Sequence, residues 1–417
     1  MPTHPNSTTV KEAFFHLIEL SLTQATSTRP CPELPDPDWI RMGVQRVLEG
    51  CESGRAFLQE HGLRFDQPPT LGNYFASLRS RRRGQLAREV SLNLVGLVDQ
   101  RLSDRLADIP ELAGYACFAC DGHWHKAATH DPRYQGTKMA VGHFYSLNLR
   151  THSLRHLAAG QGLHEHDMSA LKRIKPKGLR QAVPRGTRVL TIYDKAGVDF
   201  GYWKRCRQEC AVYFISRLKD NLCLAWEADR PWDPSDARNR GVVSDLWVSS
   251  REGHRLRLIT YVDPQSGKVF EFLTNEPDLP PGVVAELYRR RWEAEKVFDE
   301  VKNKLGQKKA WATSLAAKET QAHLIAITHN LLLCYEATLE SRHGLQNNPE
   351  DQRRRQRVKS AARECARTGS PLSVLVMRVR KATQRSVKFI RWIRRAIREE
   401  CTEAAALAHL RHLYAVM

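Results

Sequence analysis

Five segments with strand character constrain the fold more than any other feature of the chain. They lie between residues 114 and 219 and read GYACFACD, MAVGHFYSLNL, SLRHLAAG, TRVLTIYD and AVYFISRLK. The segment AGVDFGYWKRCRQEC, between the last two, has helical character. Strands interleaved with helix predict a mixed α/β sheet.

Residues 220–283 interrupt this pattern. VVSDLWVSS, HRLRLITYVD and KVFEFLTN read as antiparallel strands, and PQSG is a hairpin turn between the last two. We therefore expect an α/β domain over 111–340 with an antiparallel β insertion at about 220–283. Helical regions flank it, at 1–110 and at 341–417. In the first, DWIRMGVQRVLEG predicts a helix capped by Asp38 and ended by Gly50.

The charge of the chain indicates a polyanionic partner. The 417 residues carry a formal net charge of +19 with 41% hydrophobic content, which is enough for a sizeable core. A membrane is the other surface that attracts such a charge. The sequence has no apolar run of 18 residues and no apolar signal-peptide core, so we expect a cytoplasmic, nucleic-acid-associated protein. A basic cluster, Arg79 with Arg81, Arg82 and Arg83, is either a phosphate contact or a solvated helix surface.

The stretch ELYRRRWEAEKVFDEVKNKLG, residues 286–306, predicts a helix with two distinct stripes. The apolar stripe, which should face the core, comprises Leu287, Ala294, Phe298, Val301 and Leu305. The polar stripe comprises Tyr288, Arg291, Glu295 and Lys302. By spacing alone, Arg291 and Glu295 could be an ordinary surface ion pair.

Two aspartates favour a functional interpretation of the polar stripe. Asp121 and Asp194 each follow an apolar strand, and ligand sites of open α/β sheets lie beyond strand ends. Together with Glu295 they form a set of hard oxygen ligands suited to Mg²⁺ or Mn²⁺. Two such ions can catalyse phosphodiester displacement, with neighbouring cations holding phosphate oxygens.

These residues resemble the YREK signature of bacterial DDE transposases of the insertion-sequence-four family. The pattern Y-x2-R-x3-E-x6-K is filled without a gap by the polar stripe, and Trp292 follows the arginine as in that family. DGHWH at Asp121 resembles the first-aspartate motif, for which Asp131 in THDPRY is an alternative. LTIYDKAGVDFGYW at Asp194 resembles the second. YFISRLKDN, with Arg217 and Lys219, resembles the strand that follows.

The resemblance covers about 110–340 and implies an RNase H-like domain with a β insertion before the glutamate helix. It implies that Asp121, Asp194 and Glu295 hold two Mg²⁺ ions, for which Mn²⁺ can substitute. It assigns DNA contact to Tyr288, Arg291, Trp292, Lys302, Arg217 and Lys219. The implied reaction cuts transposon-end double-stranded DNA and joins the 3′-OH to target DNA, carried out by a homodimer whose flanking helices contact the ends or the second subunit.

Several alternatives stay open at this point. The same site could serve an RNase H-like nuclease, or a transposase-derived DNA-binding protein without catalysis. Cys117 and Cys120, followed by His123 and His125, invite a zinc site, although positions i and i+3 of a strand face opposite sides. Tyr288 could be a recombinase-type nucleophile. Relatives flip a base onto an aromatic residue, and Trp292 or Trp247 could stack on it, but both could be core residues.

Overall fold

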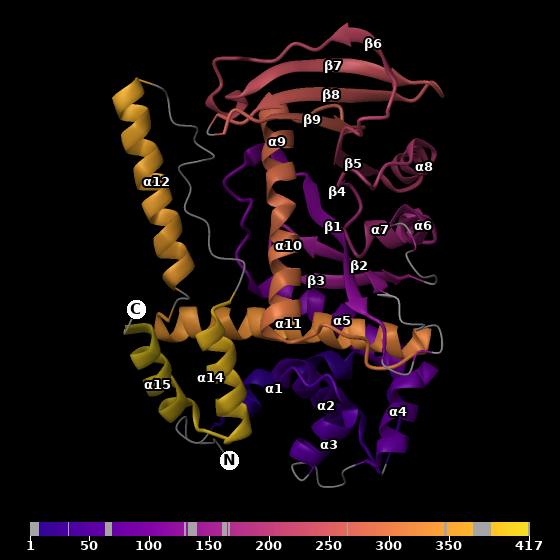
Figure 1. The fold of residues 1–417 in the computed structure, drawn as a ribbon, viewed down its shortest axis with the longest axis vertical. Coiled ribbons are helices and arrows are strands. Elements are labelled where there is room, and N and C mark those ends of the chain that lie inside the picture. Colours follow the sequence, from indigo (N-terminus) through magenta and orange to yellow (C-terminus); the bar gives the residue numbers. More distant parts are fainter. Residues whose placement is uncertain are drawn as a thin grey trace.

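The computed structural model describes residues 8–31, 33–62, 69–128, 131, 140–160, 165, 167–264, 266–345, 348–369 and 385–415. Part of the basic C-terminal tail, MRVRKATQ, lies outside these residues. Figure 1 shows a tall sheet with one long helical segment running along a face of it, above a layer of helices. Among the described helices, none has the length and apolar content that crossing a bilayer requires.

A single nine-stranded mixed sheet organises the molecule, as predicted. Its order is β3-β2-β1-β4-β5-β9-β8-β7-β6. The strands pair in parallel between β1 and β4 and between β4 and β5, and antiparallel elsewhere. Five strands form the first half: β1 Tyr115–Lys126, β2 Ala140–Asn148, β3 Leu154–Ala159, β4 Arg188–Ile192 and β5 Val212–Arg217. This arrangement is compatible with an RNase H-like fold.

The inserted strands continue the same sheet. They are β6 Leu224–Asp229, β7 Val242–Ser250, β8 Arg255–Val262 and β9 Val269–Thr274, and β9 joins them to β5. The hairpin turn at PQSG is confirmed, since β8 and β9 pair directly across it. Strand β6 was not predicted. It is the exposed edge strand, so its sequence LAWEAD lacks an apolar alternation.

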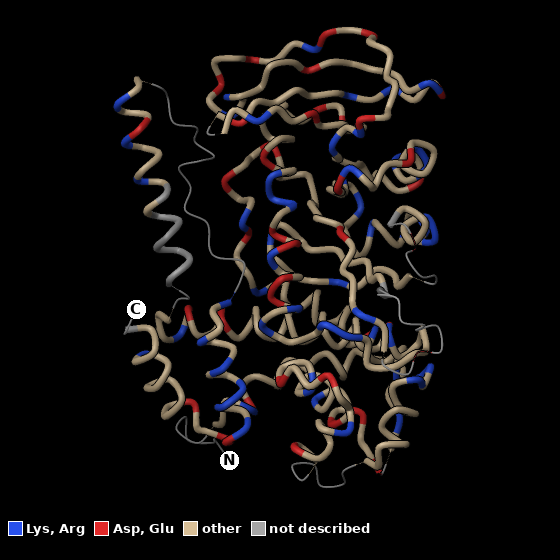
Figure 2. Tube along the Cα trace, viewed as in Figure 1, with Lys and Arg blue, Asp and Glu red and all other residues tan. Residues whose placement is uncertain are grey.

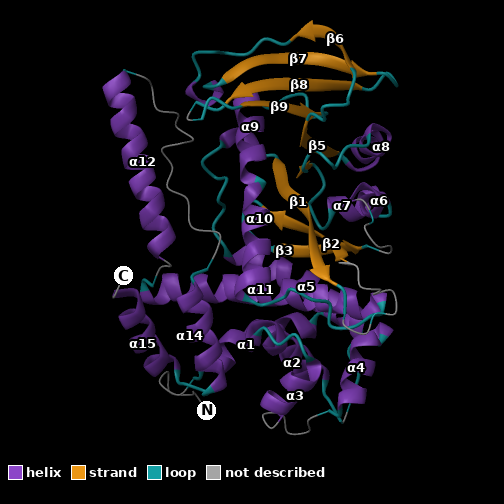
Figure 3. Ribbon diagram, in the orientation of Figure 1, coloured by secondary structure: helices purple, strands orange, loops and turns teal. Residues whose placement is uncertain are grey.

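Helices surround the sheet as Figure 3 shows. The N-terminal helices are α1 Val10–Thr23, α2 Asp36–Glu49, α3 Gly54–His61, α4 Leu71–Arg79 and α5 Arg81–Arg101. Between strands lie α6 Asp167–Lys172, α7 Pro176–Arg180, α8 Phe200–Cys210 and the short 3-10 turn η3 Ala237–Asn239, while the 3-10 turn η2 Pro110–Leu112 precedes β1. The C-terminal half contains α9 Pro281–Arg290, α10 Trp292–Asp299, α11 Leu315–His343, α12 Asn348–Thr368, α14 Val387–Arg398 and α15 Glu403–Ala415.

Helix α2 ends at Gly50 as predicted, but its start differs from the prediction. Gly50 has φ 71° and takes the left-handed conformation that glycine adopts readily. The N-terminal cap position is occupied by Pro35, and Asp38, the predicted cap, lies in the first turn of the helix. Asp36 is buried and accepts hydrogen bonds from Arg82 and from the Arg29 amide, so the tertiary contact sets the start of this helix.

Two apolar cores lie on opposite faces of the sheet. One joins helices α1–α5, α9–α11, α14 and α15 to one sheet face, so both helical flanks share a core with the β-strands. The other packs α6–α8 against the opposite face. Cys117 belongs to the first core and Cys120 to the second, because neighbouring strand positions alternate between faces. These two thiols therefore do not meet at one metal ion.

A row of five buried histidines crosses the first face of the sheet. Consecutive ring centroids are 4.6, 5.2, 5.4 and 5.0 Å apart. The row runs in the order His123, His125, His143, His156 and His323, from β1 across β2 and β3 to α11. Burial holds the pKa values of His125, His143 and His156 well below the ordinary value of 6.5, and lowers that of His323 to about 3. These imidazoles are therefore neutral in the folded chain.

We predict that acidification below pH 6.5 destabilises the fold. A histidine with a lowered folded-state pKa stabilises the fold above its unfolded pKa, and that contribution is lost as pH falls, because the unfolded chain binds the proton first. When the pH falls from about 7.5 to about 5.5, each of His125, His143, His156 and His323 should lower the free energy of unfolding by roughly 1 kcal/mol. Urea unfolding at both pH values measures the loss, and His143→Gln should reduce it. Equal stability at both pH values would contradict the prediction.

The start of α9 approaches another backbone segment closely. A Cβ on Gly282 would lie 1.9 Å from the carbonyl oxygen of Arg238, in η3. The Gly282 amide also donates a 3.0 Å hydrogen bond to Asn239 Oδ1. Only glycine fits this contact, which fixes where α9 begins relative to the insertion.

We predict that Gly282→Ala lowers the free energy of unfolding by about 1–3 kcal/mol, because backbone must move to admit the methyl group. Gly96→Ala in α5 is the control. Nothing lies within 4 Å of that Cβ position, so alanine should be neutral or slightly stabilising there. Both values come from denaturant unfolding, and an equal effect of the two substitutions would rule out the steric explanation.

Candidate active site

The parallel pairing of β1 and β4 brings Asp121 and Asp194 level with each other. The last paired residues are Ala119 and Ile192, and each aspartate lies two residues further on. The prediction that β1 ends at Asp121 is wrong: β1 continues to Lys126, paired with β2 alone. The position of Asp121 is instead set by the end of the parallel ladder, where β1 and β4 separate.

Helices α9 and α10 carry the third acidic residue across this edge. Every residue of the predicted apolar stripe is buried, namely Leu287, Ala294, Phe298, Val301 and Leu305. The single predicted helix is, however, divided. It begins at Pro281, is interrupted at Arg291, and changes to a π-helical turn, η4, over Glu300–Lys304 before Gly306. Around Arg291 the backbone hydrogen bonds span three residues, from the Arg291 amide to Tyr288 and from the Ala294 amide to Arg291.

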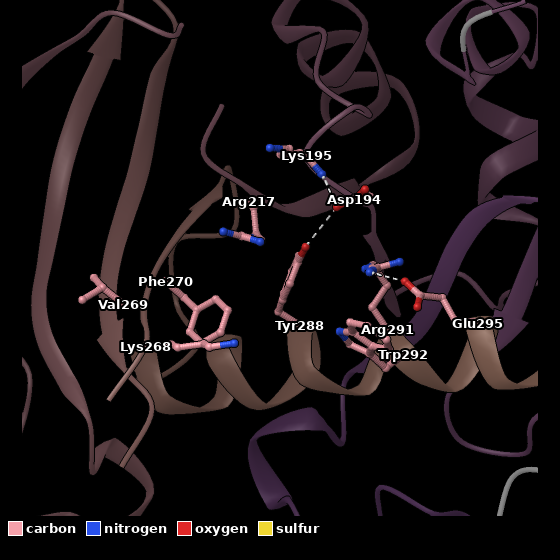
Figure 4. Close-up of a pocket in the computed structure, with 10 residues that line it drawn as sticks. All are labelled: Asp194, Lys195, Arg217, Lys268, Val269, Phe270, Tyr288, Arg291, Trp292 and Glu295. Carbon is pink, nitrogen blue, oxygen red and sulfur yellow. Dashed lines mark hydrogen bonds and ion pairs between the residues drawn. The ribbon is translucent and has the colours of Figure 1, made fainter. Parts of the chain in front are cut away.

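Arg291 joins two of the three predicted acidic residues. Its Nη1 donates to Asp121 Oδ2 at 2.9 Å and its Nη2 to Glu295 Oε1 at 2.7 Å. The Tyr288 hydroxyl donates a long, 3.4 Å hydrogen bond to Asp194 Oδ1, which also accepts the Lys195 amide. Figure 4 shows the side chains of Tyr288, Arg291 and Glu295 directed from the α9–α10 segment toward the same space as Asp194, which follows β4.

Burial and like charge act together on Asp121. Burial raises its pKa to about 6. Arg291 opposes this shift, while Glu295 and Asp194 add to it. Burial also raises the pKa of Tyr288 to about 12, so its phenol keeps its proton at neutral pH. A protonated hydrogen-bond donor suits phosphate contact better than it suits a nucleophile.

A pocket of about 700 Å³ lies beside this group of side chains. Its walls are Asp194, Lys195, Arg217, Lys268, Val269, Phe270, Tyr288, Arg291, Trp292 and Glu295. Trp292 is 55% exposed, so it is not a core residue. Lys195, Lys268, Val269 and Phe270 were not identified from sequence. Val269 and Phe270 begin β9, and Lys268 directly precedes it. The sequence could not show which end of the insertion hairpin faces the helix.

Asp121 and three other predicted residues lie outside the lining of this pocket. Lys219 is half-buried beyond β5, and Lys302 is exposed on η4. Burial lowers the pKa of His123, and the charge of Lys302 lowers it further. The alternative first aspartate, Asp131, is buried and pairs with Lys318. The structure therefore favours Asp121 as the residue beside Glu295.

The remaining candidate DNA contacts are the basic cluster at residues 79–83 and Trp247. Of the basic cluster, Arg82 binds Asp36 and Arg83 donates to the Leu34 carbonyl, so both support the fold, while Arg79 and Arg81 are exposed. Trp247 is half-buried between the guanidinium groups of Arg230 and Arg255, at 4.3 and 4.4 Å. Trp247 is therefore neither a core residue nor an indole with a free aromatic surface. Figure 2 shows Lys and Arg interleaved with Asp and Glu along α9 and α10.

The donor set fits a hard divalent cation. Asp121, Asp194 and Glu295 supply carboxylate oxygens, the ligands that such a cation prefers. Burial is the main cause of the raised pKa of Asp121, and the nearby charges of Glu295 and Asp194 add to it. In the described part of the chain, their oxygens do not all lie within 4.8 Å of one another. Metal binding therefore requires the acidic side chains to draw closer than they are around Arg291.

Comparison with known proteins agrees with this geometry. Residues 143–331 match the family model of the transposase DDE domain, a range that includes Asp194 and Glu295 but not Asp121. A curated relative from Sinorhizobium fredii (strain NBRC 101917 / NGR234), named "Putative transposase y4zB", is 28% identical over 120 residues. That alignment covers 27% of this chain and 33% of the relative, so it spans about a third of the relative's length. Both matches support a DDE transposase.

Proposed function

We propose that this chain is a transposase of the insertion-sequence-four type, which cuts transposon-end DNA and joins the freed 3′-OH to target DNA. One observation carries the proposal: Asp121, Asp194 and Glu295 gather around Arg291 and Tyr288 at the end of the parallel ladder. Of the four residues of the predicted polar stripe, Tyr288, Arg291 and Glu295 line the pocket here, and Lys302 does not.

Asp121, Asp194 and Glu295 would hold the metal, with Mg²⁺ as the ion and Mn²⁺ as a substitute. Two such ions, when bound, polarise a phosphodiester and stabilise charge on the attacking and leaving oxygens. The chain itself orients the DNA strand. Lys195, Arg217 and Lys268 line the pocket, where they can pair with phosphate oxygens, and the Tyr288 phenol can donate a hydrogen bond.

The partner we propose is double-stranded DNA, both transposon ends and target, bound by a homodimer in the cytoplasm. The helices of 1–110 would recognise the ends, and the basic helices of 341–417 would contact DNA or the second subunit. Helix α14 suits such a contact, since its apolar face is buried while Lys388, Arg391 and Arg395 are exposed on the other. Lys302 and Lys219 would reach DNA outside the pocket.

A DNA nuclease of the same fold is the second candidate, because its acidic site would be indistinguishable. The joining step separates the two activities. A transposase produces recombinant target DNA, whereas a nuclease produces only cleaved ends. Retention of all three acidic residues argues against a binding-only protein.

We predict that Glu295→Gln abolishes Mg²⁺-dependent excision of a plasmid-borne copy of the gene with its native flanking DNA. The substitution keeps the shape of the side chain and removes its charge, so a metal ligand is lost. Excision by the wild type is scored together with joining to a target plasmid.

Asp299→Asn is the matched control, since Asp299 is an exposed acid at the end of the same helix. It should excise as the wild type does. If Glu295→Gln also excised normally, Glu295 would not be a metal ligand. If the wild type cut but never joined, the nuclease would be the correct reading.

We predict that Trp292→Ala weakens binding to the flanking DNA by about tenfold while leaving thermal stability almost unchanged. The indole is mostly exposed at the pocket, where it can stack on an unpaired base, and one such contact contributes about 1–3 kcal/mol. Trp226→Ala, which removes an exposed indole on the edge strand β6, should leave DNA affinity unchanged. Equal DNA affinity of wild type and Trp292→Ala would remove this residue from the interface.

A further inference from the structure

The guanidinium of Arg291 takes up the carboxylate oxygens that a divalent cation would need. It bridges Asp121 and Glu295 through two separate nitrogens, at 2.9 and 2.7 Å. The other oxygen of Asp121 accepts the Gly122 amide at 2.9 Å. Both Asp121 oxygens are thus engaged, and a metal ion that binds this carboxylate meets the positive charge of Arg291 beside it.

We propose that Arg291 is an exchangeable counter-ion: it neutralises the acidic site before metal binds, and moves to a DNA phosphate when metal enters. The inference rests on the proposed function. It assigns Arg291 a second partner besides phosphate, and makes metal binding and DNA binding favour each other.

Electrostatics supports an exchange over a permanent bridge. Arginine cannot lose its proton in this setting, so the positive charge must stay paired as it moves. Its side chain is only 5% exposed, and an unpaired charge at that depth would be costly. A divalent cation that takes over the two carboxylates therefore leaves Arg291 in need of another anion. A phosphate offers two oxygens in the spacing that a guanidinium recognises.

The local backbone allows such a movement. Arg291 lies where α9 and α10 meet, in a stretch whose hydrogen bonds span three residues instead of four. Short 3-10 stretches within helices often mark hinges. Arg291 also lines the pocket beside Arg217 and Lys195, which are further attractors of a phosphate. The side chain therefore borders both the acidic residues and the space where DNA would lie.

The two binding events become linked by this exchange. Without DNA, metal must compete with Arg291 for the carboxylates, so its affinity is reduced. With DNA present, the phosphate draws Arg291 away and metal affinity increases, and by thermodynamic reciprocity metal increases DNA affinity by the same factor. Such a site is loaded with metal mainly when DNA is in place.

Mn²⁺ binding to the purified full chain tests the inference, by electron paramagnetic resonance of free Mn²⁺ without DNA. Arg291→Ala should bind Mn²⁺ about tenfold more tightly than wild type, the factor expected when a charged hydrogen-bond partner stops competing. A short DNA duplex should tighten Mn²⁺ binding to the wild type but not to the variant. Without metal, the variant should melt at a lower temperature, and Mn²⁺ should raise that temperature more than in wild type.

Arg289→Ala is the matched control, because Arg289 is an exposed arginine of the same helix that pairs with Glu286. It should bind Mn²⁺ as wild type does. Arg291→Gln serves as a second neutral variant where alanine prevents folding, which circular dichroism reports. Unchanged or weaker Mn²⁺ binding by a folded Arg291 variant overturns the exchange but leaves the proposed function intact. Wild-type Mn²⁺ binding no stronger than that of Asp121→Asn overturns both.

Discussion

The parallel register between β1 and β4 is the constraint on which the rest of the site depends. It places Asp121 and Asp194 at the same height on neighbouring strands, and both faces of this strand pair are covered by apolar cores. A shift of one residue would move every side chain of a strand to the opposite face. Core packing therefore fixes the position of two carboxylates that themselves contribute nothing to the core.

The chain ends contribute to the site through a second buried contact. Arg385, which precedes α14, donates its backbone amide and its guanidinium to Glu300, at 2.6 and 2.5 Å. Both side chains are almost fully buried, and breaking one such pair typically costs about 3–5 kcal/mol. Glu300 begins the π-helical turn η4, one and a half turns after Glu295. The C-terminal helices thus anchor the helix that carries Glu295.

The sheet and the glutamate helix could be predicted because their signals are local. Apolar runs gave eight of the nine strands, and helical spacing identified all five buried residues of the apolar stripe. The features that the sequence did not predict depend on contacts between residues far apart in the chain. Asp38 is not the N-terminal cap of α2, because the contact of Arg82 with Asp36 sets the start of that helix. Lys268 and Phe270 line the pocket because β9 pairs with β5. The helix break at Arg291 has no composition signal, since no proline or glycine stands there.

An acidic site inside a chain of charge +19 presents an electrostatic problem with two sides. Basic residues attract DNA, but the same residues lower the local affinity for divalent cations. Carboxylates attract those cations, but would repel the DNA of the proposed function. Arg291 and the raised pKa of Asp121 show how close these opposing charges are held. In the proposed exchange, a positive group that can pair with either carboxylate or phosphate lets one site hold both ligands. The arrival of metal frees the positive group to pair with phosphate, and the arrival of phosphate frees the carboxylates to bind metal.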